Sequence, residues 1–156
     1  MKEDQEYVSR EKFDELKKEL EFLRTTKRKE IAEGLDYARS LGDLSENSEY
    51  QEAREAQANL EDRIIKLEQI IKNANIVETK HDANKVSVGS TVTVSKEGDK
   101  GHKTFIIVGS EEADMLAGKV SNRSPFGAAV LGKKKGESFS YASPSGTITY
   151  KLIDFK

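Results

Sequence analysis

Two runs of apolar residues at helical spacing, separated by a short glycine-containing segment, constrain the fold of this chain more than any other feature. The first run, residues 9–41, has apolar positions from Phe13 and Leu16 onward, and the pattern resumes after a shift in phase at Ile31. In the second run, residues 53–74, the apolar steps alternate between four and three. Each run predicts one apolar stripe along a helix. Joined by a turn, the two helices predict an antiparallel coiled-coil hairpin with arms of about 45–50 Å.

Individual residues add local detail to this hairpin. Ser9 is predicted to cap the start of the first helix, and Gly42 is predicted to end it in a left-handed conformation. On the second helix, Glu68 lies four residues before Lys72. This spacing favours an ion pair along the helix surface.

The second half of the chain has a period of two, which predicts strands. The candidate strands are 91–95, 104–108, 137–143 and 147–155, with a turn at 144–146. Ser124 and Pro125 predict the start of a short helix that Gly132 ends. We therefore expect an α+β protein with a coiled-coil hairpin domain at 1–76, a linker at 77–84 and a small antiparallel-sheet domain at 85–156.

The composition narrows the functional classes. The 156 residues include no cysteine, which excludes disulfides and thiolate metal sites. The N-terminus has no apolar signal region and no run approaches the length of a membrane helix, so we expect a cytoplasmic protein without a membrane partner. The net charge of −2 argues against a general nucleic-acid coat, because non-specific affinity comes from neutralising phosphates.

Three carboxylates, Asp43, Glu46 and Glu49, fall within the segment between the two helical runs, whose tip is predicted at 42–47. One interpretation is structural: Asp43 and Glu46 have the spacing of a capping box at the start of the second helix. The other is chemical, because carboxylate oxygens are ligands that Mg²⁺ accepts, together with water and substrate phosphate. Two carboxylates are too few for a complete site, so such an ion would be shared with another molecule.

Several linked motifs resemble one known family. The tip sequence GDLSENSEYQEAREAQ (42–57) is similar to the coiled-coil tip of bacterial transcript cleavage factors of the GreA/GreB family, GreA type. The C-terminal segments SVGSTVTV (87–94), SNRSPFGAAVLGKKKGE (121–137) and PSGTITYKL (144–152) resemble that family's second domain. The resemblance runs in order from about Ser9 to Phe155, and it implies an FKBP-like fold for the C-terminal domain.

The resemblance implies a transcription elongation factor that acts on bacterial RNA polymerase. Such a factor inserts its coiled coil into the secondary channel and stimulates the polymerase's own Mg²⁺-dependent cleavage of the 3′ end of backtracked RNA. Asp43 and Glu46 would help to hold the second Mg²⁺, which is shared with the polymerase and not bound stably by the factor alone. The chain is therefore expected to assist an enzyme without being one.

Further site residues come from the same resemblance or from the charge pattern of the first helix. Arg39 and Arg54 match basic positions near the tip and are expected to contact the nascent RNA. Arg24 and Arg28 belong to a basic cluster that either holds displaced RNA or forms a solvated face. The residues expected to support the tip are Asn47, Glu49 and Tyr50. The residues expected to dock on the rim of the polymerase channel are Ser121, Asn122, Arg123, Ser124, Pro125 and Phe126.

Three alternatives remain open at this point. Some proteins of the same fold act as inhibitors in the polymerase channel, although the presence of both Asp43 and Glu46 favours the cleavage-stimulating class. An FKBP-like domain also raises a peptidyl-prolyl isomerase or chaperone, but the aromatic residues of this half fall at spacings suited to a core. A coiled-coil structural or nucleic-acid-binding protein would leave backtracked complexes uncut.

Overall fold

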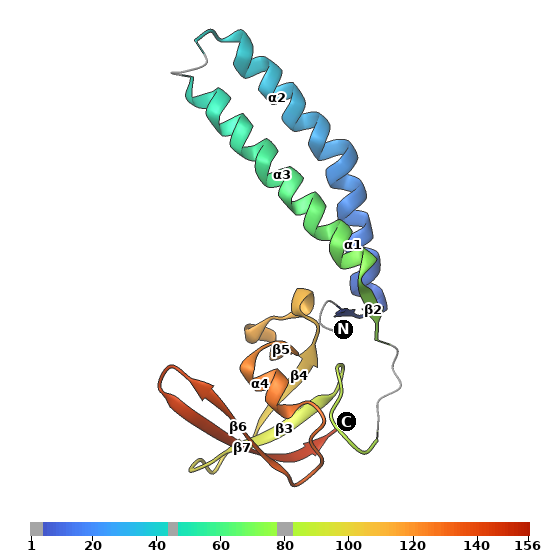
Figure 1. Ribbon diagram of the computed structural model, residues 1–156, viewed down its shortest axis with the longest axis vertical. Helices are drawn as coiled ribbons and strands as arrows, with labels where there is room; N and C mark the ends of the chain where they lie inside the picture. Colours follow the sequence, from blue (N-terminus) through green and yellow to red (C-terminus); the bar gives the residue numbers. More distant parts are fainter. Residues whose placement is uncertain (1–4, 44–46, 78–82) are drawn as a thin grey trace. The chain divides into compact units, whose positions relative to one another are not determined.

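The computed structural model describes residues 5–43, 47–77 and 83–156, which form two compact units (Figure 1). One unit comprises Phe13–Asn73, and the other joins the described residues before Phe13 to those from Ala74 onward. The predicted boundaries divide the chain by sequence order, whereas the contacts assign the N-terminal segment to the C-terminal unit. None of the helices in the described ranges is long and apolar enough to cross a membrane.

The first unit is the predicted helical hairpin. Its first arm comprises α1 (Arg10–Phe22), a π-helical turn η1 (Leu23–Lys27) and α2 (Arg28–Ser40), and its second arm is α3 (Ser48–Lys72). Figure 1 shows the two arms running side by side in opposite directions. The buried residues are at helical spacing on both arms: Leu16, Leu20, Leu35 and Ala38 on the first, and Tyr50, Leu60, Ile64 and Leu67 on the second.

The π-helical turn explains the phase shift in the first apolar run. Leu20 and Leu35 are both buried, and they lie 15 residues apart (35 − 20), one more than two heptads. A π-turn accommodates a single extra residue within a helix. Within η1, the Thr25 hydroxyl donates a hydrogen bond of 2.7 Å to the carbonyl of Glu21. The extra residue at η1 therefore returns α2 to the same apolar seam that α1 uses.

The N-terminal segment is fastened to the C-terminal unit. The short strands β1 (Glu6–Val8) and β2 (Ala74–Ile76) pair in parallel. Ser9 caps α1 as predicted, since its hydroxyl accepts from the Lys12 amide at 3.1 Å. The Ser9 amide and hydroxyl in turn donate to the Glu112 carboxylate at 3.0 and 2.7 Å.

The C-terminal unit is built on a five-stranded sheet of order β5-β4-β3-β7-β6. The strands are β3 (Thr91–Lys96), β4 (Lys103–Val108), β5 (Lys119–Ser121), β6 (Ser138–Ser143) and β7 (Gly146–Phe155). All neighbours pair antiparallel except β4 and β5, which are parallel. The four predicted strands and the α+β class are confirmed, while β5, with three residues, had no periodic signal.

The helix α4 (Pro125–Val130) buries Phe126 and Val130 in the core of this unit. Ser124 caps it, with its hydroxyl accepting from the Gly127 amide at 3.0 Å, and Gly132 follows its end with a φ of 78°. The Phe126 ring makes edge contacts with Phe105, Phe139, Tyr141 and Tyr150 at centroid distances of 5.1–6.1 Å. These rings pack on one another as core residues. This is the packing expected from their spacing in the sequence, which counted against the isomerase alternative.

Candidate functional site

The tip of the hairpin is defined by the end of α2 and the start of α3. Gly42 has a positive φ of 117°, as predicted for the residue that ends the first helix. Asp43 follows it directly and is exposed. Glu46 lies outside the described residues, so the structure places only one of the two predicted metal ligands.

Asp43 is not the N-cap of α3, contrary to the capping-box interpretation, and the bond predicted between Asp43 and Glu46 lies outside the described residues. The helix α3 begins at Ser48, and its N-cap is Asn47, whose side-chain oxygen accepts from the Tyr50 amide at 3.1 Å. Asp43 lies four residues before this cap. The N-cap of α3 is therefore supplied by Asn47 and not by the Asp43 carboxylate.

Asn47 and Tyr50 hold the two arms together at the tip. The Asn47 side-chain amide also donates to the carbonyl of Ala38 at 2.6 Å, so one side chain caps α3 and bonds to α2. The Tyr50 ring is buried with Leu35 and Ala38. Glu49 is exposed in the first turn of α3, where a negative charge suits the helix dipole.

The two arginines nearest to Asp43 are exposed. Arg54 lies over the Tyr50 ring at 6.0 Å from its centroid, a cation–π arrangement. Arg39 is 3.9 Å from the Asp36 carboxylate on the same helix, and its side chain is 55% exposed. An ion pair of this length at the surface contributes little, so both guanidinium groups remain accessible to an anion such as RNA phosphate.

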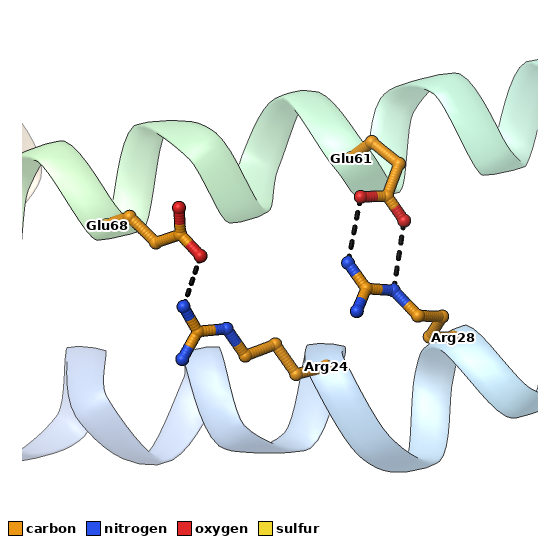
Figure 2. A network of polar contacts seen from close by, with 4 residues as sticks. All are labelled: Arg24, Arg28, Glu61 and Glu68. Carbon is orange, nitrogen blue, oxygen red and sulfur yellow. Dashed lines mark hydrogen bonds and ion pairs between the residues drawn. The ribbon is translucent and has the colours of Figure 1, made fainter.

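Arg24 and Arg28 on the first arm form ion pairs with acids on the second arm (Figure 2). Arg28 forms a two-pronged pair with the Glu61 carboxylate, at 3.0 Å from Nε and 2.8 Å from a terminal nitrogen. Arg24 pairs with Glu68, which therefore bonds to the opposite arm instead of to Lys72 as predicted. The hydrogen bond with Glu61 raises the pKa of the Arg28 guanidinium further, so this group stays charged at any working pH.

Most residues of the predicted docking segment pack or form hydrogen bonds within the chain. Phe126 is buried at the centre of the aromatic core, and Ser124 caps α4. Arg123 pairs with Glu6 at 3.0 Å and donates to the Gln5 carbonyl at 3.2 Å, which fastens the N-terminal segment. The Ser121 hydroxyl accepts from the Arg123 amide at 3.1 Å.

Phe126 is therefore a core residue and not a docking residue, in contrast to the expectation from sequence. Docking through this segment stays a prediction for the other five residues, of which Arg123 and Pro125 are exposed. A neighbouring exposed feature had no signal in the sequence: Met115 and Leu116, in the short helix η3 (Met115–Ala117), are 70% and 102% exposed. The Asp114 carboxylate accepts from the Leu116 amide at 3.1 Å and so helps to hold this turn.

In the described part of the chain, no group of three or more His, Cys, Asp or Glu side chains is arranged to hold a metal ion. Asp43 offers hard carboxylate oxygen, the donor type that suits Mg²⁺, on an exposed residue that a partner's ligands can approach. The donor chemistry thus fits Mg²⁺ with its remaining ligands supplied from elsewhere.

Comparison with known proteins agrees with these features. Residues 6–76 match the family described as transcription elongation factor, N-terminal, and residues 80–156 match transcription elongation factor, GreA/GreB, C-term. The transcription elongation factor GreA of Bacillus subtilis (strain 168) is 46% identical over 138 residues, 88% of each chain. That of Clostridium botulinum (strain Hall) is 47% identical over 156 residues, covering 99% of this chain and 98% of the other.

Among solved structures, GreA factor homolog 1 (Gfh1) of Thermus thermophilus aligns over 97% of this chain and 98% of its own, at 25% identity and a TM-score of 0.45. The two family matches together span nearly the whole sequence, on either side of the boundary between the helical hairpin and the sheet. The chain belongs to the GreA/GreB family of transcription elongation factors.

Proposed function

We propose that this protein is a transcription elongation factor that binds RNA polymerase, enters its secondary channel with the helical hairpin, and stimulates cleavage of the 3′ end of backtracked RNA. The family membership supports the general role in elongation. The observation that carries the specific role is that Asp43 is exposed at the turn while Asn47 caps α3. Its carboxylate oxygens are the donor type that suits Mg²⁺, and they lie where ligands from a partner can approach.

In this mechanism Asp43 and Glu46 supply carboxylate oxygens to a Mg²⁺ ion whose other ligands come from the polymerase. The ion would lower the pKa of an attacking water and steady the charge that develops at the scissile phosphate. The chain's own residues position and charge-balance the site. Asn47 and Tyr50 join the two helix ends that flank the turn, which supports the tip.

Arg39 and Arg54 offset the repulsion between the tip acids and the RNA backbone. Both are exposed, one at the end of α2 and one in the second turn of α3. Guanidinium groups bind phosphate oxygens with two parallel hydrogen bonds. We expect them to hold the 3′ segment of the transcript while the acids bind the metal.

The proposal is tested on stalled elongation complexes that contain backtracked RNA. Wild-type protein with Mg²⁺ is expected to release short 3′ fragments, and Asp43→Asn or Glu46→Gln is expected to slow this by at least about a hundredfold, the scale of losing one preorganised charge-stabilising group. Glu52→Gln removes an exposed acid from α3 and should cleave normally. Binding of all variants, measured by competition with wild type, should be equal.

Normal cleavage by both tip variants would overturn the metal role. Binding of the wild type without any cleavage would indicate the inhibitory class of the same fold instead.

A further inference from the structure

Each basic side chain in the cluster on the first arm has a carboxylate as a close neighbour. It contains four cations, Arg24, Lys27, Arg28 and Lys29, and each has a carboxylate oxygen within 4.0 Å. The lysines pair with acids on the same arm, Glu30 and Glu33. The arginines instead pair with Glu68 and Glu61 on the opposite arm.

These two groups of pairs differ in geometry. The lysine pairs, at 3.3 and 4.0 Å, join neighbours on one exposed helix face. Glu61 instead binds Arg28 through two nitrogens of the guanidinium, the same edge that would bind a phosphate. A phosphate can use this edge only if the carboxylate leaves.

The arginine pairs are nevertheless open to exchange. The side chains of Arg24 and Glu68 are 48% and 44% exposed, and those of Arg28 and Glu61 are 47% and 44% exposed. Water and solutes therefore reach both partners. Exposed ion pairs are weak, since solvent screens them, so a polyanion that presents several phosphates at once is able to displace them.

We propose that Glu61 and Glu68 are built-in competitors for RNA phosphates at Arg24 and Arg28, and so set the affinity of this face for the displaced strand. This rests on the RNA binding in the proposed function, extends it from Arg39 and Arg54 to Arg24 and Arg28, and adds its regulation. The acids hold the arginines in place when no strand is present. Glu61 also keeps Arg28 from binding isolated anions, which gain too little to replace a two-pronged carboxylate.

The test measures binding of a fluorescent single-stranded RNA oligonucleotide to the full-length protein at several salt concentrations. The key variant is Glu61→Gln/Glu68→Gln, which frees both arginines. Its matched control is Glu52→Gln/Glu55→Gln, which removes the same charge from exposed positions of α3 that make no ion pair with any residue in the described ranges. The comparison separates freed arginines from a general gain of positive charge.

We expect the key variant to bind the RNA about three- to tenfold more tightly than the control, from two released surface pairs. Its plot of log affinity against log salt should steepen by about 1.4, since each phosphate contact on a single strand contributes about 0.7. In an Arg24→Gln/Arg28→Gln background, the same acid substitutions should give no more gain than the control substitutions.

Equal affinity and equal salt dependence of the key and control variants would overturn the proposal. The two acids would then serve only to join the arms of the hairpin. Absence of RNA binding by every variant would overturn it as well. Circular dichroism verifies that each variant is folded. If the double variant unfolds, the single variant Glu61→Gln replaces it, and its plot of log affinity against log salt is expected to steepen by half as much. Asp43→Asn should keep the full gain, so failure of the tip mechanism is distinguishable from failure of this one.

Discussion

Asn47 joins the two arms of the hairpin through one side chain, which both caps α3 and donates to the Ala38 carbonyl. Asn47→Ala removes both bonds and should lower the free energy of unfolding by about 1–2 kcal/mol. Asn47→Asp keeps the capping acceptor and loses only the donor, so its loss should be smaller. Urea unfolding followed by circular dichroism measures both, and equal losses for the two variants would show that the cap contributes nothing.

Gly109 shows a second residue-scale constraint, in the C-terminal unit. A Cβ at this position would lie 1.5 Å from the Tyr7 carbonyl oxygen in β1, so no side chain fits without moving that strand. Gly109→Ala should therefore cost about 1–3 kcal/mol, the range for overpacking.

Gly101→Ala is the matched control for this prediction, because a Cβ there meets nothing within 4 Å. Thermal unfolding of the two variants measures the difference in stability between them. An unchanged stability of Gly109→Ala would mean that β1 is not held closely against this turn.

At the scale of the element, the π-turn η1 makes a prediction about length. Because it holds one extra residue, deleting Thr26 should let α1 and α2 continue as one regular α-helix with the same apolar seam. Leu20 and Leu35 would then be two heptads apart, and stability should change by less than about 0.5 kcal/mol, the scale of a surface change.

Deleting Lys66 from α3 provides the contrast, because it rotates Ile64 and Leu67 out of phase with each other. That deletion should cost at least about 2–5 kcal/mol, as for loss of buried apolar side chains. If the Thr26 deletion is as damaging as the Lys66 deletion, the π-turn is required for the fold and is not a tolerated insertion.

The elements predicted from sequence are those with a repeating signal. The helical stripes, the alternating strands and the caps at Ser9 and Ser124 were all readable because each depends on neighbours a few residues away. The short strands β1, β2 and β5 were missed, since three residues carry no period and their pairing joins distant segments.

For the candidate site as well, features that depend on nearby residues were predictable, and features that depend on distant residues were not. The turn at Gly42 and the exposure of Asp43 depend on local sequence and were predictable. The pairing of Arg24 with Glu68 was not, because spacing along one helix says nothing about which residues face each other across two. Nor was the burial of Phe126, since its exposure is decided by the sheet against which α4 packs.

At the scale of the whole molecule, charge and chemistry are divided between the two halves. Residues 1–80 carry 15 basic and 20 acidic residues, a net of −5, whereas residues 81–156 carry 11 and 8, a net of +3. The acidic half contains the proposed metal ligands, and in the described residues it offers no complete site. We propose that this protein lends two carboxylates, Asp43 and Glu46, to a reaction that takes place in another protein's active site.

The most direct test is the Mg²⁺ dependence of RNA cleavage in arrested complexes, with and without the factor. If Asp43 and Glu46 help to bind the second ion, wild-type protein should lower the Mg²⁺ concentration needed for half-maximal cleavage, by about tenfold or more for roughly 1.4 kcal/mol of added binding energy. The double variant Asp43→Asn/Glu46→Gln should bind the polymerase and leave that concentration at its value without the factor. A double variant that lowers the Mg²⁺ requirement as wild type does would contradict the account.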